Sequence, residues 1–152
     1  MKFLNNYSNR ELNIWAELIL DILVSFYFFP KIFPLIIDGQ LYSEALVGII
    51  ANTIIIAIIY SIFVFGAINT LTKREEKDER DYIYELKSYR ISNIISQVSI
   101  YLLISLIVFN PINQVRLNEF TAPMIAMLLL IIALFSSTGK SLTQLFNYRK
   151  NI

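Results

Sequence analysis

Two acidic residues in the first apolar run are the first candidates for a functional site. Glu17 and Asp21 lie four residues apart within residues 14–37, so a helix places both on one face. An ionised carboxylate at membrane depth costs several kcal/mol unless it is paired or hydrated. Such a pair predicts either a site for a proton or cation, or structural ion pairs.

Polar residues in the third and fourth apolar runs could join these two carboxylates. Asn93 and Gln97 belong to a stripe with Ser92 and Ser96 in the cytoplasmic half of the third run. Lys140 follows several hydroxyl residues at a comparable depth on the fourth. We therefore expect Glu17, Asp21, Asn93, Gln97 and Lys140 as candidate ligand-binding or ion-binding residues around one pocket open to the cytoplasm.

A structural role for the same residues remains open. Glu17 lies within about a turn of the interface and could extend its carboxylate to water. Asp21 could form an ion pair with Arg90 or Lys140, and the amides of the third run could bond neighbouring helices. Both interpretations fit the spacing.

Composition excludes most enzyme classes. The 152 residues contain neither cysteine nor histidine, which removes thiol nucleophiles, disulfides, the usual zinc ligands and imidazole acid–base chemistry. The net charge of +1 provides no attraction for nucleic acid. We predict no catalytic activity, no cofactor, no metal site and no nucleic-acid partner.

Four apolar runs of membrane length indicate an all-α membrane protein. A helix satisfies its own backbone hydrogen bonds in lipid, whereas a lone strand cannot. Two prolines, Pro30 and Pro34, should kink or end the first helix near its far side. The sequence predicts a single domain, residues 1–152, folded as a polytopic four-helix bundle. The expected spans are about 14–37, 45–71, 91–109 and 122–139.

The central polar stretch, residues 72–90, is expected to form a cytoplasmic hairpin. It contains six of the thirteen basic and six of the twelve acidic residues. Asp78 and Asp81 have the spacing of a capping box, so one helix should run from about Asp78 to Phe109. Its first turns would then extend into the cytoplasm, with Lys87 and Arg90 where the helix meets the lipid headgroups.

Basic residues predict the orientation of the chain. Eleven lie in the N-terminal lead, the central stretch and the C-terminal tail, against two in the outer segments. By the positive-inside rule both termini are cytoplasmic. We expect a multi-pass protein of a cell membrane, and the abundance of isoleucine and asparagine favours a bacterial source.

The central stretch resembles a motif of a known group of proteins. Residues 78–81 read D-E-R-D and residues 87–92 read K-S-Y-R-I-S, similar to the D-E-R-D and K-[AS]-x-R-x-S signature of uncharacterised small bacterial and archaeal four-span membrane proteins. This chain has Tyr84 where that pattern usually has isoleucine. The resemblance implies regulation or protection, because similar proteins are found beside small helix-turn-helix regulators, and it implies no catalytic residue. The motif residues Asp78, Arg80, Asp81, Lys87 and Arg90 are candidates for partner binding or structure.

Two functions from different classes follow. The first is a non-enzymatic sensor, regulatory or self-protection protein that acts by binding a peptide, a lipid or a partner protein. We expect the protein to be a homodimer. The second is a small oligomeric channel or transporter coupled to a cation or proton, in which the carboxylates of the first helix bind the ion.

Overall fold

The computed structural model describes residues 9–41, 43–72, 78–109 and 121–150. All regular structure in these ranges is helical, as the sequence predicts. The helices are α1 (Asn9–Ile37), α2 (Glu44–Tyr60), the π-helix η2 (Ser61–Phe65), α3 (Gly66–Leu71), α4 (Glu79–Phe109) and α5 (Ala122–Lys150). Because α2, η2 and α3 follow without a break, they form one rod, and the structure has four helices long and apolar enough to cross a membrane.

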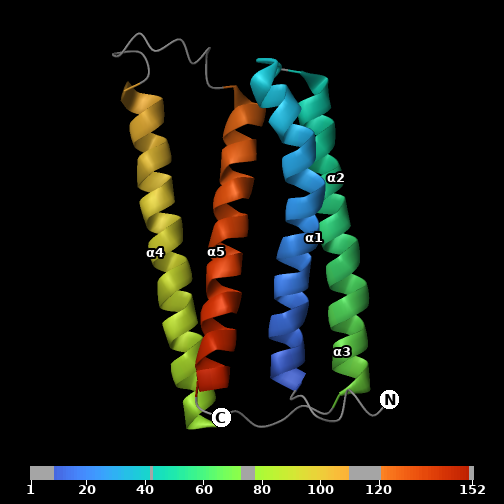
Figure 1. Ribbon diagram of the computed structural model, residues 1–152, viewed down its shortest axis with the longest axis vertical. Coiled ribbons are helices and arrows are strands. Elements are labelled where there is room, and N and C mark those ends of the chain that lie inside the picture. The colour runs from blue at the N-terminus through green and yellow to red at the C-terminus, as the bar shows by residue number, and fades with distance from the viewer. Residues whose placement is uncertain (1–8, 42, 73–77, 110–120, 151–152) are drawn as a thin grey trace.

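The helices alternate in direction, and α4 lies at one edge (Figure 1). Helices α1, α2 and α5 pack against one another, whereas the backbone of α4 approaches only that of α5 among the described helices. The starts of α1 and α4 and the ends of α3 and α5 lie at one end of the molecule, which we call the charged end. The arrangement is therefore a group of three rods with a peripheral fourth helix.

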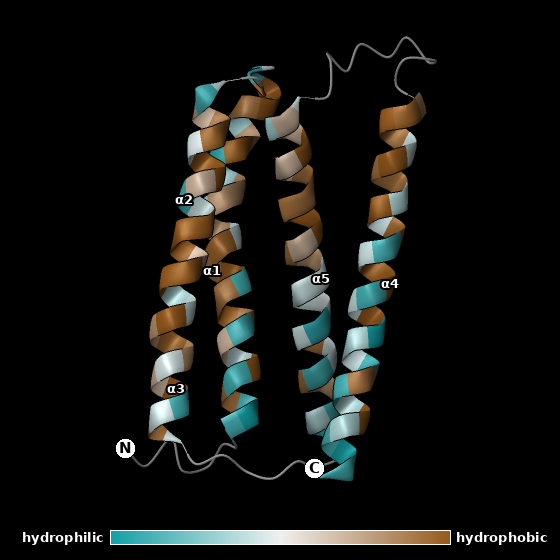
Figure 2. Ribbon diagram, turned by 180° about the vertical axis from the view of Figure 1, so that it is seen from behind, coloured by the Kyte–Doolittle hydropathy of each residue, from teal (hydrophilic) through white to brown (hydrophobic). Residues whose placement is uncertain are grey.

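The larger of two apolar clusters in the three-rod group lies away from the charged end. Phe28 and Ile32 of α1, Leu46 of α2, and Met124 and Met127 of α5 are buried together there. Burying such a side chain from water stabilises a fold by about 1.5–3 kcal/mol. In a membrane, where the side chain is already out of water, close packing between the helices stabilises the fold instead. Figure 2 shows hydrophobic residues dominating this region and hydrophilic ones gathering at the charged end.

A turn follows the first helix, and the prolines do not end that helix. Helix α1 continues past Pro30 and Pro34 to Ile37. It ends at Gly39, whose φ of +66° favours glycine. The Gly39 amide donates to the Ile36 carbonyl at 3.4 Å and the next amide donates to Leu35 at 2.9 Å, which is a Schellman motif.

Helix α4 starts where the capping pattern predicts. The Asp78 carboxylate accepts a hydrogen bond from the Glu79 amide at 2.6 Å, and the Asp81 carboxylate accepts one from the Asp78 amide at 3.1 Å. The second bond is the reciprocal half of a capping box. The prediction of one continuous helix up to Phe109 is confirmed.

Small residues bring α4 and α5 together. Ser92 and Ser96 of α4 contact Ser136 of α5 with hydroxyl oxygens 2.6 and 2.8 Å apart, and the Ser136 hydroxyl donates to the Ser92 carbonyl at 3.0 Å. One turn further along α5, a Cβ added to Gly139 would lie 2.6 Å from the Ile95 Cδ1 atom. The helices approach closely because this position has no side chain.

Candidate functional site

Helix α5 presents polar side chains to two neighbours at once. Its hydroxyl and amino groups between Ser136 and Ser141 reach α1 on one side and α4 on the other. A helix among apolar neighbours gains from such bonds because the polar groups find few other partners in lipid. This stretch of α5, together with the facing residues of α1, forms the candidate site.

The first predicted carboxylate, Glu17, is neutralised by α5. The Lys140 Nζ atom lies 2.9 and 3.1 Å from its two carboxylate oxygens, and the Ser141 hydroxyl lies 3.4 Å from one of them. Both charged side chains are mostly buried, with exposures of 31% for Glu17 and 19% for Lys140. Lys140 also lies 5.2 Å from the centre of the Tyr89 ring of α4. The pair therefore connects α1 to α5 next to α4.

The second predicted carboxylate, Asp21, has a different environment. Its side chain is buried, with 5% exposure, and the Thr138 hydroxyl lies 3.4 Å from it. That hydroxyl also donates to the Leu134 carbonyl at the shorter distance of 2.8 Å. No lysine or arginine of the described chain forms an ion pair with Asp21. The interpretation that Asp21 pairs with Lys140 or Arg90 is therefore wrong, because Lys140 pairs with Glu17 and Arg90 is exposed.

Asp21 borders a groove of about 460 Å³ between α1, the α2–η2 rod and α5, which we call the Asp21 groove. Three hydroxyl residues, Thr53, Ser61 and Ser137, share its lining, and the other lining residues are apolar. Ser61 is the first residue of the π-helix η2, and π-helical turns often occur at functional sites.

The expected single pocket is not formed. Asn93 and Gln97 are exposed on α4, whose backbone does not approach that of α1. Ser92 and Ser96, each one residue earlier, are the ones that face α5. A step of one residue turns a side chain by about 100° around the helix, so the two amides point away from the contact between α4 and α5. The structure thus brings together Glu17 and Lys140, with Asp21 nearby, and leaves Asn93, Gln97 and Arg90 outside.

A cluster at the charged end joins three helices. Arg10 of α1 forms an ion pair with Asp81 of α4, and the Tyr148 hydroxyl of α5 donates to the same carboxylate at 2.6 Å. Burial opposes ionisation of Asp81, but hydrogen bonds from Tyr148 and the Asp78 backbone, together with the Arg10 charge, hold the pKa of its carboxyl below the ordinary value. Because the pKa of Asp81 is lowered, its carboxyl group is ionised at neutral pH. Asp81 precedes the apolar part of α4.

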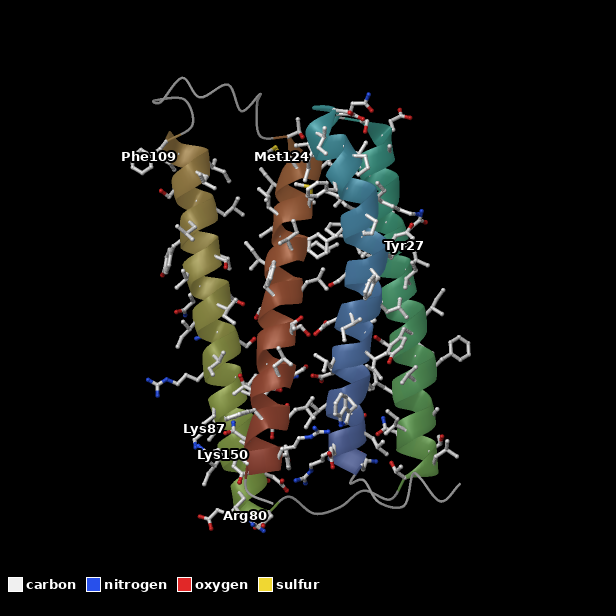
Figure 3. All side chains as sticks on the ribbon, in the orientation of Figure 1. Tyr27, Arg80, Lys87, Phe109, Met124 and Lys150 are labelled. Carbon is white, nitrogen blue, oxygen red and sulfur yellow. The ribbon has the colours of Figure 1, made fainter. Side chains whose placement is uncertain are left out.

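The remaining motif residues are exposed. Arg80 contacts the capping residue Asp78, with Nε 3.3 Å from a carboxylate oxygen. Lys87 and Arg90 instead line a groove of about 820 Å³ between α1, α4 and α5, which we call the basic groove. Arg149 of α5 is the third basic residue of its lining, and none of the lining residues is acidic. Figure 3 shows Arg80 and Lys87 on the charged half of α4.

Sequence reasoning did not find Arg10, Tyr148 or Arg149 as site residues. Arg10 and Asp81 are 71 residues apart, and no local spacing connects them. Among the described residues, no group of three or more acidic side chains is placed to hold a metal ion. No protein-family model matches this chain, and neither a curated protein nor a solved structure does.

Exchanging one member of the Glu17–Lys140 pair should destabilise the protein. We expect Lys140→Met or Glu17→Gln alone to lower the free energy of unfolding by about 1–3 kcal/mol, because the remaining charge stays among apolar helices. The double variant should recover most of that loss. Denaturation in detergent micelles, followed by far-UV circular dichroism, measures both. Additive losses in the double variant would contradict coupling between the two side chains.

Proposed function

We propose that this chain is a multi-pass protein of a cell membrane with both termini cytoplasmic. Four helices long and apolar enough to span a bilayer support the location. The excess of basic residues in the lead, central stretch and tail supports the orientation. The same end of the molecule carries the Arg10–Asp81 pair, which suits the aqueous side of a membrane.

We further propose that the protein is a non-catalytic regulatory or self-protection protein that acts by binding a partner through α4. The observation that carries this proposal is the position of α4, whose backbone approaches only that of α5 among the described helices. Helix α1 reaches α4 through Arg10 at the charged end, and most residues of α4 are exposed. The Glu17–Lys140 and Arg10–Asp81 pairs support it as well. In each pair the two charges neutralise each other and connect two helices, which is a structural role. The resemblance of the central motif to small membrane proteins near regulators agrees with this role.

The partner we propose first is a second copy of the chain. Exposed apolar side chains on α4, such as Val98 and Leu102, offer a surface for another helix, with exposures of 53% and 61%. A peptide or another membrane protein could use the same helix. In lipid such a contact is stabilised by close packing of the helices, because the apolar side chains are already out of water.

A second candidate function is movement of a cation or proton. Asp21 favours it, because a buried carboxylate without a described basic partner lies on a groove with three hydroxyl residues. Four spans leave little room for a pathway, so this function requires an oligomer. Glu17 contributes less to it, since Lys140 already neutralises it.

The absence of cysteine allows a direct test of the orientation. Gln40 in the α1–α2 turn and Arg80 near the start of α4 are both exposed. In intact cells a membrane-impermeant maleimide should label Gln40→Cys but should label Arg80→Cys only after permeabilisation. Labelling of Arg80→Cys alone in intact cells would reverse the proposed orientation.

Partner binding through α4 is tested by cross-linking in membranes. Single cysteines replacing Val98 or Leu102 should form disulfide-linked dimers on mild oxidation, detected by non-reducing gel electrophoresis. Ile55→Cys on α2 is the matched control, because Ile55 has a similar exposure of 51% on a different rod. Cross-linking at Ile55 equal to that at the α4 positions would contradict a specific α4 interface.

Cation movement is tested with purified protein in liposomes. If the second candidate is right, Asp21→Asn should lower proton or alkali-cation flux by about tenfold or more, since the charge that binds the ion is lost. Asp38→Asn, the same chemical change in the exposed turn after α1, should leave the flux unchanged. Wild-type liposomes that show no flux above empty ones would rule this candidate out.

A further inference from the structure

The basic groove contains three cationic side chains without an acidic counterpart in its lining. Lys87 and Arg90 come from α4 and Arg149 from α5. No ion pair joins any of the three to an acidic residue of the described chain. Arg149 instead lies over the Trp15 ring of α1, 5.4 Å from its centre. The groove is therefore suited to a negatively charged ligand.

Apart from Thr143 and Asn147, the rest of the lining is apolar. Moving away from the charged end, α1 contributes Trp15 and then Leu18, and α5 contributes Arg149 before Leu142. Trp15 and Arg149 thus lie nearer the charged end than Leu18 and Leu142, whereas Arg90 follows Tyr89, whose ring lies beside Lys140, and is therefore deeper. Further apolar residues of the lining are Ile91, Leu145 and Phe146.

Cationic side chains beside apolar walls match an amphiphile from a membrane leaflet. A phosphate would lie beside the basic residues, and an acyl chain would follow the apolar walls toward the bilayer interior. Basic pockets between membrane helices on the cytoplasmic side are a known form of anionic headgroup recognition. The groove volume of about 820 Å³ is within the range of small-molecule sites.

We propose that the basic groove binds one anionic phospholipid of the cytoplasmic leaflet. Its phosphate contacts Lys87, Arg90 and Arg149, and its acyl chain lies along Leu18 and Leu142. This inference rests on the proposed membrane location but on neither partner binding nor cation movement. Because the groove is walled by α1, α4 and α5, a bound lipid would also hold α4 against the other helices.

Trp15 provides a specific reporter, because it is the only tryptophan of the chain and lines the groove. The protein is reconstituted in phosphatidylcholine liposomes with an equal fraction of phosphatidylglycerol or phosphatidylcholine carrying brominated acyl chains. Bromine quenches tryptophan fluorescence only at short range. We expect stronger quenching by the anionic lipid, corresponding to a preference of about tenfold or more.

Neutral variants test the residues. Each of Lys87→Gln, Arg90→Gln and Arg149→Gln should lower the preference about fivefold, and the triple variant should abolish it. Lys150→Gln is the matched control, since Lys150 is the next residue of α5, has the same charge and is not part of the lining. A similar loss in Lys150→Gln would show that general surface charge attracts the lipid, which overturns the groove proposal.

Further outcomes separate the proposals. Equal quenching by both brominated lipids in the wild type would overturn the lipid site while leaving the membrane location intact. No quenching by either lipid would instead contradict the membrane location. Inorganic phosphate added to the liposomes should not reduce the quenching; a reduction would identify a site for small anions and overturn the phospholipid. Circular dichroism confirms that each variant keeps its helical content.

Discussion

The structure depends on compensating a charge that an apolar helix brings into the bundle. Glu17 of α1 is mostly buried, and Lys140 of α5 supplies the opposite charge at 2.9 Å. Removing either partner would leave an unpaired charge among apolar side chains, at a cost of about 1–3 kcal/mol. The pair therefore fixes both the distance and the register between α1 and α5, and α5 in turn contacts every other long helix of the described chain. Helices α2 and α4 then pack against this α1–α5 pair, α2 against both helices and α4 against α5.

The elements themselves were predictable because their causes are local. Long apolar runs determine where helices can span a membrane, and the Asp78–Asp81 spacing places the start of α4 within one residue. The turn at Gly39 is equally local, since a left-handed residue ends a helix wherever it occurs. Pro30 and Pro34 were harder to interpret, because a helix in lipid tolerates proline where neighbouring groups satisfy the freed carbonyls.

Partners between helices were not predictable in the same way. Helical spacing shows which residues share a face but not which neighbour that face meets. Asn93 and Gln97 share a polar stripe with Ser92 and Ser96, yet only the serines meet α5. The helix order decides the outcome, because α4 is separated from α1 by α5 along most of its length. Contacts such as Arg10 with Asp81 require that order to be known beforehand.

The two carboxylates of α1 have different surroundings although both lie beside α5. Lys140 neutralises Glu17, whereas Asp21, one turn further, borders a groove whose lining contains no basic residue. On the other side of the α1–α5 contact, the basic groove contains no acidic residue. Because α2 walls one groove and α4 the other, the cation and the anionic lipid that we propose would occupy separate grooves. A ligand in the basic groove would act on α4, whose backbone approaches only that of α5 among the described helices, and would therefore change the surface offered to a partner.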